Sequence, residues 1–429
     1  MACRTLLLGT SMSSAILPGE AEESGSRSEA LPTVAVLSVA ATATAAREGH
    51  ILAAILCAPL VSFLNTIGLV PFLSVIAEEL DTSVSALGQV TAVSMVVATG
   101  LGLVAGQFAD RYGYRRMLMV GLGTVILSAF ASAFAFSFVA LLIAGLIGAV
   151  SRAVVAPISL TIAGTWFEGT ARQRTMGLVS AAIAGAAVIG VPLMASVAAL
   201  WSWRLAFAAL GVTAAAAIVL TRRALPADRS KSTSRLGVRE ILGAYRPLLG
   251  DRPTLSILGS NLFRTTGAWA VGTYIATFLV RDRDLSVQQA SLAFAVAGLG
   301  LFSGSLAAGG PLRIMAPREL LVGCSAIGTS LVGVSMALPV PTLWVFGLVF
   351  AGLFLNGLGN VAANLLLVDE TPAGPATTMS LNGAALSLAS AMGGVVGGLL
   401  LALGGYTAIG WSGPVLGVLA ALLAWNSRR

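Results

Sequence analysis

Uninterrupted apolar runs, each long enough to cross a lipid bilayer, recur along almost the whole chain. A membrane-spanning helix needs about 20 consecutive apolar residues and must satisfy its own backbone hydrogen bonds. The runs lie at residues 51–73, 84–105, 117–136, 138–162, 175–199, 205–221, 254–280, 288–309, 319–338, 342–366, 379–403 and 408–425. Charged residues are 10% of the sequence, against about 25% in soluble domains, which excludes a soluble globular enzyme. We therefore predict an all-α polytopic membrane protein with twelve transmembrane helices.

One long polar stretch after residue 50 divides these spans into two sets of six. It runs from Thr221 to Pro253 and contains eight of the 25 basic residues. We expect an N-terminal six-helix half, a basic cytoplasmic linker and a C-terminal six-helix half, at residues 51–221, 222–253 and 254–429. Residues 1–50 hold a polar segment between two short apolar stretches. We expect a disordered cytoplasmic extension there, with a cleaved signal peptide as the alternative.

The distribution of basic residues between alternate loops predicts the orientation in the membrane. Loops that stay cytoplasmic hold the excess of Lys and Arg. With the N-terminus inside, twenty of the 25 basic residues fall in inside segments, three fall in outside loops and two fall within spans. Both termini are therefore predicted to be cytoplasmic.

Composition argues against metal, redox and nucleic-acid chemistry. The chain has one histidine, His50, and three scattered cysteines, Cys3, Cys57 and Cys324, without the spacing of a metal site or a disulfide framework. The net charge of +7 would by itself fit a nucleic-acid partner, but nearly all of it lies in short loops between spans. The spans contain no histidine and no deep carboxylate for acid–base catalysis. We expect no cofactor, no metal, no nucleic acid and no enzymatic activity.

The loop between spans 2 and 3 carries the most specific pattern in the chain, because residues 106–116 read GQFADRYGYRR. Glycine allows tight turns, and a carboxylate at a helix end can pair with nearby arginines. The string resembles the G-x-x-x-D-R-x-G-x-R-R signature of the major facilitator superfamily, whose twelve-span layout is similar over residues 51–429. In that family the loop locks and releases the inside gate, whereas the alternative is that its arginines are only topology anchors. The resemblance implies a gating role for Gly106, Asp110, Arg111, Gly113, Arg115 and Arg116.

Span 5 carries a second resemblance, in Gly185, Gly190 and Pro192. Their spacing is similar to the glycine–proline signature of the antiporter branches of the same superfamily. Glycine and proline permit a bend and a close helix approach, so plain helix packing is the alternative reading. Met194 and Ala195 replace the usual glycine pair, a departure that weakens the implication of export. Together with the turn at residues 201–207, the pattern resembles the drug and sugar (arabinose-type) efflux antiporters.

Two arginines lie at membrane depth, Arg152 in span 4 and Arg264 in span 7. Ionisable residues are expensive there and mark functional sites by default. Asp110, Asp369 and Glu370 lie only near the cytoplasmic ends of spans, so an anionic substrate or cavity water is the expected partner of each arginine. The alternative is an arginine that bonds to helix carbonyls or extends toward the membrane surface.

Asparagines at helical spacing extend this set of candidate substrate-binding residues. Asn261 is three residues before Arg264 in span 7. Three asparagines in span 10 follow one another at intervals of four residues and so lie on one face of a helix. A single asparagine would instead hold two helices together. The remaining candidates are Asn65, Asn356, Asn360 and Asn364.

The function that these patterns predict is secondary transport by alternating access between the two halves. We expect outward movement of a small organic solute across the cytoplasmic (inner) membrane of a bacterium, by a monomer embedded in the lipid bilayer. Uptake or exchange of a small organic anion is the alternative, and a non-transporting receptor of the same fold is a third reading. Proton coupling stays open: either Asp110 or the pair Asp369 and Glu370 would carry the proton, or substrate gradients drive the protein.

Overall fold

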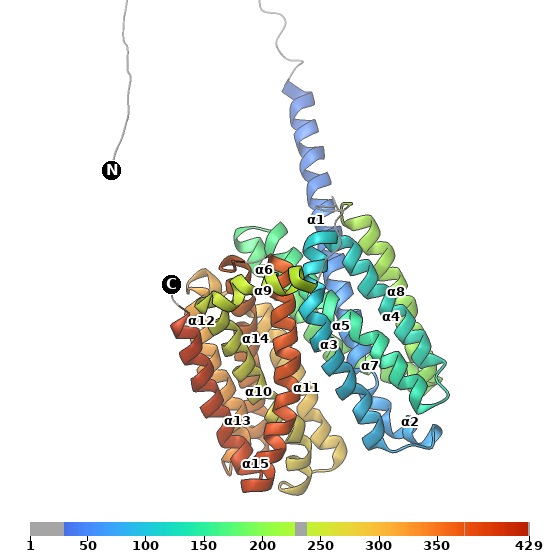
Figure 1. Cartoon of the computed structure of the whole chain (residues 1–429), viewed down its shortest axis with the longest axis vertical. Helices are drawn as coiled ribbons and strands as arrows, with labels where there is room; N and C mark the ends of the chain where they lie inside the picture. Colours follow the sequence, from blue (N-terminus) through green and yellow to red (C-terminus); the bar gives the residue numbers. More distant parts are fainter. Residues whose placement is uncertain (1–29, 228–237, 373, 428–429) are drawn as a thin grey trace, which may run out of the picture. The chain divides into compact units, whose positions relative to one another are not determined.

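The computed structural model describes residues 30–227, 238–372 and 374–427, and within these ranges every regular element is helical. The first six spans are built from α1 (Ala30–Ile67), η1 (Val70–Phe72), α2 (Leu73–Glu79), α3 (Val84–Tyr112), α4 (Tyr114–Ala133), α5 (Phe138–Trp166), α6 (Gly169–Gly185), η2 (Ala186–Gly190), α7 (Val191–Leu200) and α8 (Trp203–Ala224). The remainder is built from α9 (Val238–Gly250), α10 (Arg252–Arg281), α11 (Val287–Ala307), η3 (Pro311–Arg313), α12 (Pro317–Gly323), η4 (Cys324–Gly328), α13 (Thr329–Ala337), α14 (Thr342–Asp369) and α15 (Pro375–Asn426). Figure 1 shows these helices coloured along the chain.

The described helices confirm the predicted all-α membrane fold. Ten of them, counting helices interrupted by a π turn as one, are long and apolar enough to cross a membrane. One of the ten, α15, contains two predicted spans, which are joined where Gly404 and Gly405 leave helical backbone geometry. The predicted seventh span corresponds to α10, which is 30 residues long but falls outside the ten because its middle is polar.

Polar caps begin several of the helices and so fix where the loops end. The side chains of Ser83, Ser137 and Ser202 accept hydrogen bonds from backbone N–H groups three residues later, at 3.0, 3.2 and 3.2 Å. Ser286 forms a reciprocal capping box with Gln289 at the start of α11. Such caps satisfy N–H groups that have no partner within the helix.

Two predicted segments differ from the structure. Residues 30–50, predicted as part of a disordered extension, are helical within α1, where an alanine-rich run favours helix. Residues 1–29 lie outside the described residues. The predicted linker at 222–253 contains a helix, α9, in which apolar residues recur at helical spacing.

The core consists of three clusters of buried apolar side chains. One lies within the first half around Val125 and Phe207, and another lies within the second half around Phe278. The third cluster joins helices of both halves and includes Ile158 of α5 and Leu365 of α14. The two halves therefore share a continuous apolar contact in this conformation.

Small residues permit close contact between the halves where α3 packs on α15 and α6 packs on α11 (Figure 1). A Cβ atom added at Gly106 would collide with the backbone of Ala376. One added at Gly177 would lie 2.6 Å from the carbonyl oxygen of Ser305. Glycine at these positions allows backbones to approach, as in other membrane helix interfaces.

Candidate functional site

A polar cavity lies within the N-terminal half, between α1, α3, α4, α5 and α8. Its empty volume, mouth included, is about 510 Å³. Arg152 of α5 and Asn65 of α1, both predicted site residues, lie on its wall. Among the described residues that line it, Arg152 is the sole charged side chain. The full lining is Asn65, Thr66, Leu69, Val90, Ser94, Met95, Ser128, Ser132, Leu141, Gly145, Gly148, Ala149, Arg152 and Phe207.

Two N–H groups of the Arg152 side chain are buried and have no hydrogen-bond acceptor within the described part of the protein. These groups are at Nε and Nη1. The guanidinium lies over the ring of Phe63, with its carbon 5.9 Å from the ring centroid, an arrangement that attracts a cation. Leaving buried donors of a charged group unpaired is costly, so this site favours an acceptor supplied from outside the protein.

Hydrogen bonds within the protein orient the other polar groups of the cavity. The Ser128 hydroxyl donates to the carbonyl of Ala144 at 2.8 Å, and its oxygen accepts from Asn65 Nδ2 at 3.1 Å. The second Asn65 atom, Oδ1, is buried and unpartnered. Gly148 leaves room for this arrangement, because a Cβ atom there would lie 2.7 Å from Asn65 Nδ2.

Arg264, the second predicted arginine, lies in a hydrogen-bond network within the C-terminal half, in which both Nη atoms have protein acceptors and Nε has none among the described residues. Its side chain is 3% exposed. Nη1 donates to the carbonyl oxygen and to Oδ1 of Asn356 at 2.8 and 3.0 Å, and Nη2 donates to Asn261 Oδ1 at 3.0 Å. The structure thus joins three predicted site residues to one another, in the carbonyl-bonded arrangement that was the structural alternative for Arg264.

A third asparagine, Asn382 of α15, extends this network to Asn364 and was not predicted. Its Oδ1 accepts from Asn261 at 2.9 Å, and its Nδ2 donates to Asn364 at 3.1 Å. Its signal in the sequence was a polar side chain in an otherwise apolar span, the same signal that identified the other asparagines. Asn360 has no hydrogen-bond partner in the described part of the chain, and its side chain is half-buried.

The loop 2–3 residues contact the other half of the molecule at the start of α15. Asp110 accepts hydrogen bonds from the backbone N–H groups of Ala376 and Thr377 at 3.2 and 2.9 Å, and from the Thr377 hydroxyl at 2.8 Å. The N-terminus of a helix carries partial positive charge, so it attracts a carboxylate. A Cβ atom at Gly374 would overlap the Asp110 carboxylate. The sequence pattern predicted a gating role for Asp110 but not this partner.

The other loop residues connect α3 and α4 to neighbouring helices. Gly113 has a φ of 101°, a value that favours glycine and turns the chain between the two helices. Arg115 donates from Nη2 to the carbonyl of Arg222 at the end of α8, at 2.8 Å. Arg111 and Arg116 also have interactions in the structure. The loop is therefore fixed within its own half while Asp110 reaches across to α15.

Two further contacts join the halves at the same end of the molecule. Arg172 of α6 forms an ion pair with Asp369 of α14 at 2.5 Å. Gln173 donates to the carbonyl of Leu312 at 3.4 Å. This end is closed by polar contacts in which each partner comes from a different half.

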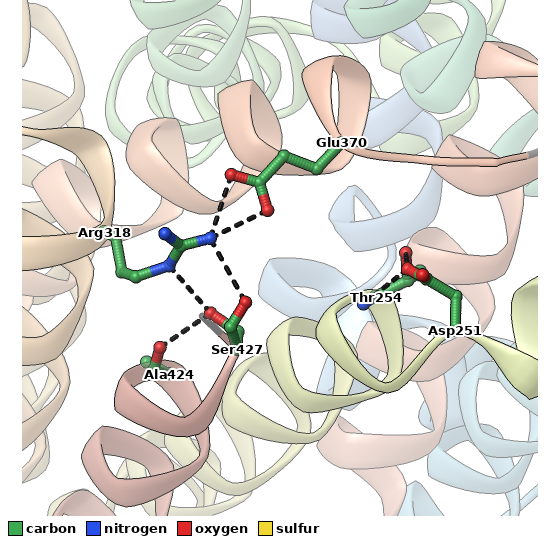
Figure 2. Close-up of polar contacts among 6 residues, drawn as sticks. All are labelled: Asp251, Thr254, Arg318, Glu370, Ala424 and Ser427. Atoms are coloured by element: carbon green, nitrogen blue, oxygen red, sulfur yellow. Dashed lines mark hydrogen bonds and ion pairs between the residues drawn. The ribbon is translucent and has the colours of Figure 1, made fainter. Parts of the chain in front are cut away.

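A cluster at the end of α14 holds the C-terminal half together (Figure 2). Arg318 Nη2 donates to both carboxylate oxygens of Glu370, at 2.9 and 2.8 Å, and Arg318 Nε donates to Ser427 Oγ at 3.0 Å. The Ser427 hydroxyl in turn donates to the carbonyl of Ala424 at 2.7 Å. The adjacent carboxylates thus have different partners. Asp369 pairs with Arg172 of the other half, whereas Glu370 pairs with Arg318 of its own half.

The helix α9 is attached to α3 close to loop 2–3. The Tyr245 hydroxyl donates to the carbonyl oxygen of Leu103. Burial raises the pKa of Tyr245, a hydrogen bond with Gln107 lowers it, and the charge of Asp110 raises it again. The net direction is upward, so the phenol keeps its proton and remains a donor near neutral pH.

The span 5 pattern coincides with a π-helical turn. Gly185 ends α6, Gly190 ends the π turn η2, and Pro192 follows in the first turn of α7. A Cβ atom at Gly190 would lie 2.9 Å from the side chain of Leu64 in α1. The predicted bend is thus a local change of helix type, at a close approach of α1.

A family model, relatives by sequence and solved structures all relate this chain to the same family of membrane transporters. The family model described as Major Facilitator Superfamily matches residues 55–378. The chain is 26% identical over 358 residues to an uncharacterized MFS-type transporter, YceJ, of Bacillus subtilis (strain 168), with 80% of this chain and 89% of the relative covered. It is 24% identical over 372 residues to a probable sugar efflux transporter of Mannheimia succiniciproducens, with 83% and 89% covered. The crystal structure of the human organic anion transporter MFSD10 (TETRAN) is similar with a TM-score of 0.71 and 19% identity, covering 88% of this chain and 99% of that one.

Proposed function

The chain belongs to the major facilitator superfamily, and on that premise we propose that it exports a small organic solute across the cytoplasmic membrane of a bacterium. The family consists of membrane transporters of small molecules, not enzymes. Export would proceed by alternating access, in which two six-helix halves rock and expose a site to one side of the membrane at a time. In this proposal the transporter is a monomer, and both chain termini lie in the cytoplasm.

The observation that carries the assignment of the substrate site is the unpartnered guanidinium of Arg152. Its Nε and Nη1 donors are buried at a polar cavity, whereas the donors of Arg264 to Asn261 and Asn356 are already engaged. A buried cation without a partner is unfavourable unless a ligand or water completes it. We therefore assign Arg152 and Asn65 to substrate contact, and we assign Arg264 to positioning the helices around it.

The contacts of Asp110 and Arg172 support a gating role for the end of the molecule that they close. Under the predicted orientation this end faces the cytoplasm. Closure there would prevent a solute from returning inward while it leaves toward the outside. Opening would require Asp110 to leave the start of α15 and Arg172 to separate from Asp369, and both steps exchange protein contacts for water.

Export as the direction rests on the span 5 pattern and on the sugar efflux relative of Mannheimia succiniciproducens. A second candidate is uptake or exchange of a small organic anion, which the positive charge of Arg152 favours. The two candidates share a binding site and differ in the direction of net movement.

Transport into membrane vesicles of opposite orientation tests the proposal. Inverted and right-side-out vesicles that contain the protein would be energised and supplied with radiolabelled arabinose, gluconate and chloramphenicol. We expect accumulation of at least one of them in inverted vesicles, and its loss in Arg152→Gln but not in Arg281→Gln, an exposed arginine at the end of α10. Accumulation only in right-side-out vesicles would support the second candidate. An imposed pH gradient in the same vesicles would show whether protons drive the movement.

A further inference from the structure

We propose that the substrate is a hydroxylated carboxylate, bound with its carboxylate at Arg152 and with a hydroxyl group at Asn65. This inference rests on the proposed transport function and adds the chemical class of the substrate. It follows from the unequal distribution of hydrogen-bond donors and acceptors around the cavity of the N-terminal half.

One side of the cavity is a cationic donor. Arg152 offers Nε–H and Nη1–H groups that have no acceptor in the described structure. No carboxylate occurs among the described lining residues, so the site has a positive charge that the protein itself does not balance there. A carboxylate matches a guanidinium in both charge and hydrogen-bonding geometry.

Three of the hydroxyl groups that line the cavity can act only as acceptors, because their own protons are already used. Thr66 donates to the carbonyl of Ser62 at 3.2 Å, and Ser94 donates to the carbonyl of Val90 at 2.7 Å. Ser128 donates to the carbonyl of Ala144 at 2.8 Å. A hydroxyl has one donor and two acceptor positions, so each of these oxygens keeps an acceptor position.

The orientation of the Asn65 amide follows from the same accounting. Since the Ser128 proton goes to Ala144, the Ser128 oxygen can only accept from Asn65, which places Nδ2 toward Ser128 and leaves Oδ1 free. Oδ1 is buried and has no partner. A buried carbonyl oxygen without a donor is unfavourable, so the ligand is expected to supply an O–H group.

Other chemical classes satisfy only part of this site. A neutral sugar would supply hydroxyl groups to Asn65 but would leave the charge of Arg152 unbalanced. A fatty or aromatic carboxylate would pair with Arg152 but would leave Asn65 Oδ1 unpaired. A lipophilic cation would be repelled by Arg152.

A binding experiment with matched probes tests the inference without reference to the direction of transport. Purified full-length protein in detergent would be titrated with D-gluconate, hexanoate, D-glucose and chloride, with binding measured by calorimetry and by the shift in melting temperature. Gluconate has both groups, hexanoate has only the carboxylate, and glucose has only hydroxyls. We expect gluconate to bind at least about tenfold more tightly than each of the other three.

Two substitutions separate the two contacts. Arg152→Gln removes the charge and should weaken gluconate binding roughly tenfold to a hundredfold, while glucose binding stays unchanged. Asn65→Leu removes the free acceptor and should reduce the preference for gluconate over hexanoate. Arg281→Gln is the matched control, because this arginine is exposed and makes no hydrogen bond or ion pair in the described structure.

The wild-type titration alone can contradict the inference, so the test does not depend on whether a variant folds. Equal binding of hexanoate and gluconate would overturn the hydroxyl contact. Binding of glucose or chloride at least as tight as that of gluconate would overturn the carboxylate assignment. Export of a neutral or cationic solute in the vesicle assay, without gluconate binding, would preserve the transport proposal and reject this substrate class.

Discussion

Arg152 in the N-terminal half is partly buried beside a cavity, whereas Arg264 in the C-terminal half is fully buried among asparagines. Nε lacks an acceptor in both, but Arg264 Nη1 and Nη2 donate to Asn356 and Asn261, whereas Arg152 Nη1 is buried without an acceptor. The same side chain near the middle of a long helix is thus part of a hydrogen-bonded network in one half and borders a cavity in the other. The difference shows that the depth of a charge does not by itself identify a substrate contact, because neighbouring asparagines decide whether the charge is already satisfied.

Among substitutions that test this difference between the arginines, we expect Arg264→Ala to have the largest effect on stability. The substitution leaves the oxygens of Asn261 and Asn356 buried without donors, which should cost about 3 kcal/mol of folding free energy or more. We expect a clear fall in the apparent melting temperature in detergent, compared with Arg281→Ala as the control. A melting temperature within about 2 °C of wild type would contradict a structural role for Arg264.

Arg152→Gln should leave stability nearly unchanged but reduce transport. The substitution removes no hydrogen bond within the described structure and loses only the contact of the guanidinium with the Phe63 ring, so the melting temperature should be nearly unchanged or higher. Transport in vesicles should fall by roughly tenfold or more, because the substrate loses a charge-assisted hydrogen bond. A variant that unfolds more readily but transports normally would reverse the roles that we assign to the two arginines.

Gly148→Ala tests the cavity wall with a single methyl group. The added carbon would lie 2.7 Å from Asn65 Nδ2 and 2.8 Å from Ser128 Oγ, so it should displace the Asn65 amide. Overpacking of this kind costs roughly 1–3 kcal/mol, and we expect a several-fold loss of substrate affinity. The control is Gly123→Ala in α4, where a Cβ atom would meet nothing within 4 Å. Equal behaviour of the two variants would argue against the Asn65 contact.

Asp110→Asn acts on the contact between loop 2–3 and α15 rather than on either arginine. The amide loses the charge that favours the helix N-terminus, and its NH2 group cannot accept the bonds of the oxygen that it replaces, so the ratio of closed to open molecules should fall about fivefold or more. Spin labels at Arg174 and Glu319, exposed residues of opposite halves, would report a larger fraction of long distances. An unchanged distance distribution would argue that Asp110 does not stabilise closure.

The sequence predicted the fold well because apolar length is a local property. The run at 138–162 corresponds to α5 at Phe138–Trp166, and the run at 342–366 corresponds to α14 at Thr342–Asp369. The interruption in α15 was also predicted, as a break between two runs. The helix in the linker was missed, because its polar composition concealed the spacing of its apolar residues.

The candidate site was less accessible to sequence reasoning, because its contacts join distant parts of the chain. Spacing within span 7 relates Asn261 to Arg264, but the partner Asn382 lies 121 residues from Asn261. Similarly, Asp110 bonds to a helix start 266 and 267 residues away. Which arginine remained free could be decided only once these long-range partners were known.

The neighbouring carboxylates of Asp369 and Glu370 suggest how the closed end can open at a useful rate. The Asp369 side chain is 53% exposed, so its pairing with Arg172 is close to a surface ion pair, which typically contributes only about 0–1 kcal/mol. Glu370 is less exposed, at 25%, and binds Arg318 through both oxygens. When the halves separate, the weaker connection can therefore break while the stronger one carries the end of α14 away with its own half. The pair of Arg172 and Asp369 therefore adds little to the free energy that separation of the halves would require, whereas Arg318 and Glu370 keep the end of α14 attached to its own half.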